Sequence, residues 1–159
     1  MNLENFTIET PRLTLSGLKN DIQTGQPVIA LHGWLDNAAS FLPLAEHLSV
    51  SRPFYALEMP GHGLSEHRPE SSTYHLVENI VDVLAFIDVI AKRHNVVGQA
   101  VTLIGHSLGG IVCSLIAASA PERVDKLILL DSLGPLTDAT KDVLPQLRKA
   151  VAKITTFKE

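Results

Sequence analysis

The residues with the clearest chemical potential form the pentapeptide Gly105-His106-Ser107-Leu108-Gly109. It follows a short apolar run, residues 101–104, and precedes a segment of helical character, residues 108–120. On a sharp strand-to-helix turn a serine hydroxyl projects above the sheet, and flanking glycines let the strand and helix cross closely. This context predicts that Ser107 is a catalytic nucleophile. The alternative is a serine in an ordinary tight turn.

A nucleophilic serine needs an oxyanion hole, which is a pair of N–H groups aimed at the negative charge that develops during attack. The backbone N–H of Leu108, directly after the serine, is one candidate donor. The other is the N–H of Trp34, which follows His32 and Gly33 after an earlier apolar run. Gly33 would let this loop approach the serine. His32 could act as a general base, but we favour a role in holding the loop in shape.

The rest of the chain alternates between strand and helix patterns, which predicts an α/β fold with a mostly parallel sheet. Short apolar runs typical of buried parallel strands are residues 28–31, 53–57, 101–104 and 126–130. Helices are expected over residues 38–48 with Asn37 as the N-cap, from a cap at residues 71–73 to about residue 92, and over residues 108–120. Residues 6–9 and 12–18 alternate in polarity and predict an antiparallel hairpin.

Four segments in this order resemble the α/β-hydrolase superfamily and, within it, the serine hydrolase-like proteins. They are LHGWLDNA at 31–38, PGHGLS at 60–65, GHSLGG at 105–110 and VDKLILLD at 124–131. The resemblance covers about residues 28–136. It implies a nucleophile at Ser107, oxyanion donors at Trp34 and Leu108, and support of the oxyanion loop and elbow by a further set of residues. That set is His32, Gly33, Gly105, His106 and Gly109. One small departure is Glu58, where these proteins often have aspartate.

A larger departure concerns the catalytic base, because the family order is serine, then an acid, then histidine. All seven histidines precede Ser107, the last being His106. The resemblance therefore predicts an α/β-hydrolase sheet truncated after the strand that follows the elbow helix. Residues 1–134 would be the N-terminal part of the core, and residues 135–159 the start of a cap. Asp131 is a candidate acid, and the alternative is an aspartate that caps a turn at a strand end.

Composition excludes several other classes of function. The chain has 159 residues, 45% hydrophobic and 19% charged, with a net charge of -4. Such a charge gives no strong field to attract nucleic acid or an anionic membrane. The single cysteine, Cys113, cannot form an internal disulfide, and the first four residues lack a secretory signal, so a cytoplasmic location is expected. No zinc-ligand spacing or phosphate-binding loop is present, so we expect neither a metal nor a cofactor.

Residues 96–120 contain no charged residue and are long enough to span a bilayer as a helix. Scattered polar residues and the glycines at 105, 109 and 110 argue against that alternative.

The sequence thus favours a hydrolase that attacks an ester or related acyl bond of a small molecule through a covalent acyl-enzyme on Ser107. The alternative is a noncatalytic binding module that retains the nucleophile elbow. Strand 126–130 would lack its usual neighbour, so self-association through an exposed sheet edge is also expected.

Overall fold

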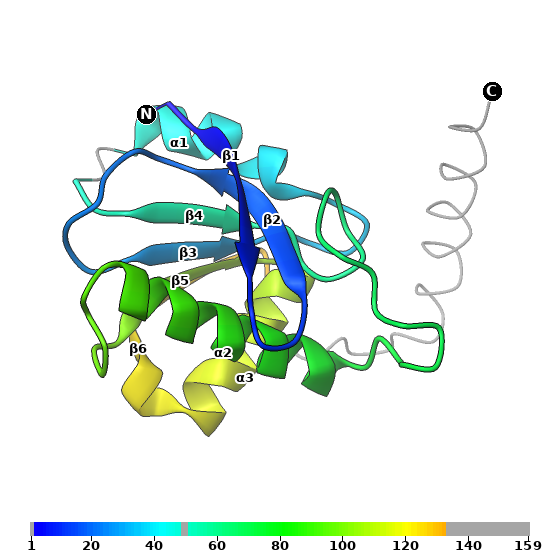
Figure 1. The fold of residues 1–159 in the computed structure, drawn as a ribbon. Helices are drawn as coiled ribbons and strands as arrows, with labels where there is room; N and C mark the ends of the chain where they lie inside the picture. The colour runs from blue at the N-terminus through cyan, green and yellow to red at the C-terminus, as the bar shows by residue number, and fades with distance from the viewer. Residues whose placement is uncertain (1, 49–50, 133–159) are drawn as a thin grey trace.

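The chain folds around one mixed sheet of six strands in the order β1-β2-β4-β3-β5-β6 (Figure 1). The computed structural model describes residues 2–48 and 51–132, so the expected cap at 135–159 lies outside the described residues. The strands are β1 (Glu4–Glu9), β2 (Thr14–Lys19), β3 (Val28–Leu31), β4 (Phe54–Leu57), β5 (Val101–His106) and β6 (Val124–Leu130). The helices are η1 (Ala38–Phe41), α1 (Leu42–His47), α2 (Leu76–Arg93), α3 (Leu108–Ser119) and η2 (Pro121–Arg123). The predicted α/β class is confirmed.

The direction of the strands brings the loop after β3 and the turn after β5 to the same edge of the sheet. β1 pairs antiparallel with β2, and β2 pairs antiparallel with β4, as expected of an N-terminal hairpin joined to the sheet. β3 runs parallel to both β4 and β5, with Leu31 in register with Gly105. Because parallel strands end at the same edge of a sheet, the loop after β3 and the turn after β5 must emerge side by side.

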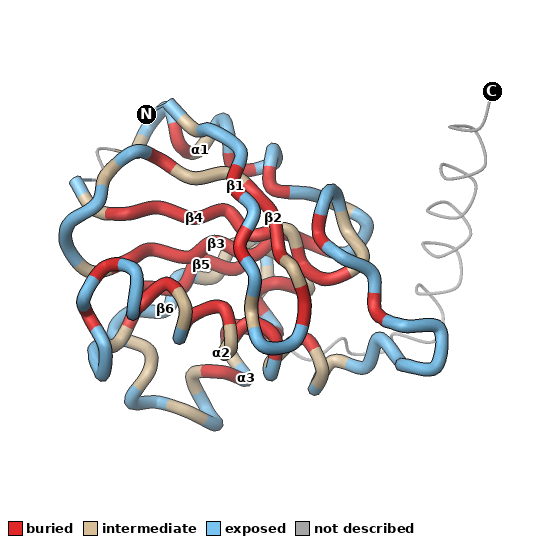
Figure 2. The backbone as a smooth tube through the Cα atoms, viewed as in Figure 1, coloured by how far each residue is buried: buried red, intermediate tan, exposed pale blue. Residues whose placement is uncertain are grey.

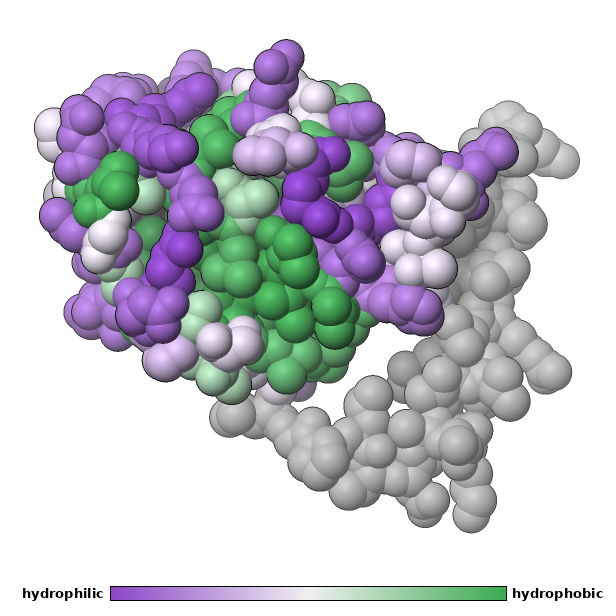
Figure 3. Space-filling view, turned by 60° about the horizontal axis from the view of Figure 1, so that its bottom comes forward, coloured by the Kyte–Doolittle hydropathy of each residue, from purple (hydrophilic) through white to green (hydrophobic). Residues whose placement is uncertain are grey.

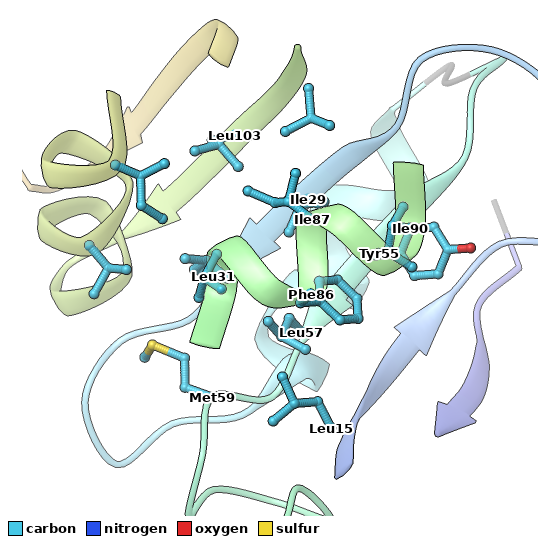
Figure 4. Close-up of a cluster of buried hydrophobic side chains, with 14 of the residues drawn as sticks. Leu15, Ile29, Leu31, Tyr55, Leu57, Met59, Phe86, Ile87, Ile90 and Leu103 are labelled. Atoms are coloured by element: carbon cyan, nitrogen blue, oxygen red, sulfur yellow. The ribbon is translucent and has the colours of Figure 1, made fainter. Parts of the chain in front are cut away.

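The central strands are buried on both faces, which explains their continuous apolar runs. β3 and β4 are buried along their whole length (Figure 2). On one face, Ile29, Leu31 and Leu103 pack with Phe86 and Ile87 of α2 (Figure 4). On the other face a smaller cluster includes side chains from β3, β4 and η1: Val28, Ala30, Phe41, Phe54 and Ala56. The two clusters hold the sheet between helical layers and fix its carboxyl edge.

Two helix predictions need refinement. The predicted helix at 38–48 is divided into the 3-10 turn η1 and the short α1, and Asn37 caps η1 by accepting a hydrogen bond from the Ala39 N–H at 2.9 Å. The prediction that residues 71–73 cap the next helix is wrong. There a turn is closed by a hydrogen bond from the Ser72 N–H to the carbonyl of Pro69, and α2 begins only at Leu76.

The uncharged stretch at 96–120 is divided between β5 and α3. Among the described residues, no helix combines the length and the apolar character that crossing a membrane requires.

A buried ion-pair network ties the start of α2 to the N-terminal hairpin. Asp82 is fully buried and accepts hydrogen bonds from Arg68 and, at 2.6 Å, from Nε of Arg12. The Arg68 side chain is only 4% exposed and also donates to Asn79. Asp82 raises the pKa of Arg12, chiefly through this hydrogen bond. The network anchors the loop that connects β4 to α2.

Replacing Asp82 with alanine is expected to lower the free energy of unfolding by about 3 kcal/mol, because it leaves the buried guanidinium of Arg68 with only its longer pair to Glu78, at 3.6 Å. Urea unfolding followed by circular dichroism measures this change. Glu78→Gln is the matched control, since the Glu78 side chain is 39% exposed and its pairs with Arg12 and, at 3.6 Å, with Arg68 are worth about 1 kcal/mol or less each. Equal losses in the two variants would contradict the assignment.

An apolar area remains exposed around α3 and β6 (Figure 3). Ile111 and Leu115 lie on the outer face of α3, and Leu127 and Ile128 are 36% and 43% exposed on β6. Among the described strands β6 lies at the edge of the sheet, with β5 as its partner. Unpaired strand edges beside apolar side chains favour association with a second chain.

We therefore expect this chain to self-associate through β6. Light scattering should show a mass above that of the monomer that increases with concentration, and Ile128→Lys should shift the distribution toward the monomer. A stable monomer at high concentration would argue against the edge as an interface.

Candidate active site

Ser107 occupies a strained turn between β5 and α3. Its backbone angles are φ 49° and ψ -116°, a region that non-glycine residues rarely adopt. It is the N-cap residue of α3, its side chain is exposed, and its N–H donates to the carbonyl of Leu130 at 3.1 Å. The neighbouring strand β6 therefore helps to hold the turn. The predicted strand-turn-helix context of Ser107 is present.

The glycines at the elbow are required by close backbone approach. A Cβ at Gly109 would collide with the carbonyl oxygens of Leu31 and His32, where α3 crosses the end of β3. A Cβ at Gly105 would collide with the backbone of Gly110. These contacts involve backbone atoms, which cannot rotate away as side chains do, so both positions exclude a larger residue.

The two candidate oxyanion donors lie beside the elbow. No acceptor for the N–H of Trp34 or of Leu108 is found within residues 2–48 and 51–132. Leu108 is the first residue of α3, where backbone N–H groups lack intrahelical partners and carry partial positive charge. A Cβ built on Gly33 would lie 3.4 Å from Cβ of Ser107, which shows how closely the loop of residues 32–36, called the oxyanion loop after its expected role, approaches the serine.

His32 fixes the orientation of this loop from the interior. Its ring is fully buried, Nε2 accepts the N–H of Met59 at 3.1 Å, and Nδ1 contacts the carbonyl oxygen of Gly33 at 2.6 Å. Burial lowers the pKa of His32 to about 4, so the ring is neutral and Nδ1 carries the proton that it donates. In a trans peptide the C=O and the following N–H point in opposite directions. Holding the Gly33 carbonyl inward therefore turns the Trp34 N–H outward.

His106 connects the elbow to the same loop. Its Nδ1 lies 4.0 Å from Oδ2 of Asp36, and its ring lies against Gly33, 3.2 Å from a Cβ built there. Asp36 also accepts hydrogen bonds from Ser40 and from the N–H of Asn37 at 2.9 Å. The sequence patterns described above gave Asp36 no role of its own. The structure places its carboxylate between the loop of residues 32–36 and the elbow, hydrogen-bonded within its own segment and 4.0 Å from the His106 ring.

Glu58, the small departure from the family pattern, supports the loop that follows β4. Its carboxylate accepts the N–H of Leu64 at 2.6 Å. Gly63 has φ 51°, and a Cβ there would collide with the Glu58 carboxylate. Glutamate therefore caps this loop, residues 58–66, at the position where aspartate is frequent.

Asp131 directly follows β6, is exposed, and adopts a left-handed φ of 49°. It has no hydrogen bond or ion pair within the described residues, so neither the acid role nor the turn-cap role gains a contact there. Nor does the described part of the chain bring three or more metal-ligating side chains together.

Comparison with known proteins explains this geometry. Residues 26–154 match the family described as "alpha/beta hydrolase fold". The chain belongs to the α/β-hydrolase family. Among solved structures, this α/β-hydrolase is similar to a hypothetical protein from Pseudomonas aeruginosa PAO1, with 37% identity and a TM-score of 0.70. That alignment covers 94% of this chain and 52% of the other.

Curated relatives of this α/β-hydrolase point to the same group. A serine hydrolase-like protein of Danio rerio is 32% identical over 95% of this chain and 48% of its own length. A probable serine hydrolase of Drosophila melanogaster is 36% identical over 97% of this chain and 45% of its own length. This α/β-hydrolase chain therefore spans about half the length of these relatives.

Proposed function

We propose that this chain carries the nucleophile and the oxyanion hole of a serine hydrolase that acts on an ester or a related acyl bond. The Ser107 hydroxyl attacks the carbonyl carbon of a small-molecule substrate, and the Trp34 and Leu108 N–H groups bind the oxyanion of the tetrahedral intermediate. The alcohol leaves with the proton that the Ser107 hydroxyl gives up, which leaves an acyl group on Ser107, and water then hydrolyses this ester to the carboxylic acid and restores the hydroxyl.

One observation carries the proposal: an exposed serine in a strained turn lies beside two N–H groups for which the described residues supply no acceptor. Backbone strain of this kind costs about 1–3 kcal/mol and persists where the surrounding structure enforces it. Here the enforcement comes from the glycine crossings and from the hydrogen bond between Ser107 and Leu130. Similarity to serine hydrolase-like proteins supports the same role.

The test is to trap the acyl intermediate with an activated ester such as p-nitrophenyl acetate. Peptide mapping by mass spectrometry should find the acyl group on Ser107, in the native protein and in a Ser119→Ala control, and not in Ser107→Ala. Ser119 is a suitable control because it lies on the same helix and only donates to the Leu115 carbonyl, at 2.7 Å, and more weakly to that of Ile116. Absence of any adduct on Ser107 would favour the alternative, a noncatalytic module that retains the elbow.

A further inference from the structure

The loop that contains His62 is a rigid support beside the oxyanion loop. The Glu58 N–H donates to the carbonyl of Ser16, and the Glu66 N–H donates to the carbonyl of Thr14, both at 2.9 Å. Both ends of this loop are thus fixed to β2. The backbone of any side chain that reaches from this loop to the oxyanion loop is therefore held in place.

His62 makes that connection. Its Nε2 lies 3.3 Å from the backbone N of Leu35, and its Nδ1 lies 3.2 Å from the carbonyl oxygen of Pro60. A backbone N–H can only donate, so Nε2 is the acceptor and Nδ1 carries the proton that goes to Pro60. Leu35 has a left-handed φ of 55°, which is unusual for leucine and needs an external contact to hold it.

His62 and His32 form a reciprocal pair between the two loops. His32, on the oxyanion loop, accepts the N–H of Met59, which lies in the loop of residues 58–66, and donates to the carbonyl of Gly33. His62, on the loop of residues 58–66, accepts the N–H of Leu35 and donates to the carbonyl of Pro60 in its own loop. The two rings lie 4.9 Å apart between centroids. The Gly33–Trp34 peptide and the Leu35 N–H are therefore held from both sides of Trp34.

We infer that His62 is a positioning residue for the Trp34 oxyanion donor. By accepting the Leu35 N–H it fixes the strained residue after Trp34, while His32 fixes the peptide before it. The inference rests on the proposed function for its catalytic consequence. The contact between His62 and Leu35, however, can be measured independently of any chemistry at Ser107.

Two substitutions separate the acceptor from the donor of His62. Glutamine can place an oxygen near the position of Nε2 and accept from Leu35, whereas asparagine reaches only the position of Nδ1. Amide hydrogen exchange at Leu35, measured by NMR, should accelerate about fivefold in His62→Asn and His62→Leu, because one net hydrogen bond is lost. His62→Gln should retain most of the protection. His67→Leu, in the adjacent exposed stretch, is the matched control and should leave Leu35 unchanged.

The catalytic consequence is measured as the rate at which a fluorophosphonate labels Ser107. The rate should fall about tenfold in His62→Asn and His62→Leu and recover in His62→Gln, because an oxyanion donor contributes only when it is aimed at the developing charge. Equal exchange rates at Leu35 in all variants would overturn the inference, as would an unchanged labelling rate where protection is lost. If native protein fails to label at Ser107, the proposed function fails, and hydrogen exchange still decides whether His62 holds Leu35.

Discussion

Replacing Ser107 with alanine is expected to remove all serine-dependent ester hydrolysis while the protein stays folded. In the proposed mechanism the hydroxyl oxygen is the attacking atom, and alanine has no atom that can replace it. The side chain is exposed, and among the described residues none hydrogen-bonds to its hydroxyl, so little stability should be lost. Hydrolysis rates and thermal unfolding measured on the same preparation check both parts. Wild-type rates in the variant would place the nucleophile elsewhere.

A glycine at position 107 separates the effect of backbone strain on stability from the effect of losing the hydroxyl on activity. Ser107→Gly also lacks the hydroxyl and should be equally inactive. Because glycine adopts positive φ without steric cost, this variant should be about 1 kcal/mol more stable than Ser107→Ala. If the two variants unfold at the same denaturant concentration, the elbow is not strained as the backbone angles indicate.

The 159-residue chain by itself is expected to show only faint turnover of esters, about 10³ to 10⁴ above the uncatalysed rate. This is what an oxyanion hole and substrate binding typically leave when a triad member is missing. No histidine follows Ser107 in the sequence. Of the upstream histidines, His32 and His62 use both ring nitrogens in holding loops, and His106 faces Asp36.

Steady-state assays with an activated ester measure this turnover rate directly, and the rate of Ser107→Ala is subtracted as background. Rapid, repeated turnover that disappears in Ser107→Ala would show that an upstream histidine serves as the base. His106→Gln would then be the first variant to examine, because His106 is adjacent to the nucleophile.

Sequence patterns predicted the structural context of the candidate nucleophile but not the contacts that hold its loops. The strand-turn-helix context of Ser107 was predictable because an apolar run, a glycine pair and a helical segment are contiguous in the chain. The placement of Trp34 beside it followed from parallel pairing of β3 with β5. These features depend on local pattern and on the geometry of parallel sheets.

The supporting contacts were not predictable because they join loops that are distant in sequence. Asp36 meets His106, and Leu35 meets His62, only through the paths of two irregular loops. The start of α2 was misplaced for a related reason. Serine and threonine at 71–73 look like helix caps, but a turn uses residues 69–72 and the helix begins later.

In the proposed function, the native fold activates Ser107 by its position and by the Trp34 and Leu108 N–H groups. The most direct measurement compares fluorophosphonate labelling of the native chain with labelling of the urea-unfolded chain, followed by peptide mapping. We expect slow labelling at Ser107 alone in the native protein, with Ser114 and Ser119 of the same helix unmodified, and no labelling above background after unfolding. Labelling at another serine, or equal labelling of native and unfolded protein, would contradict the account.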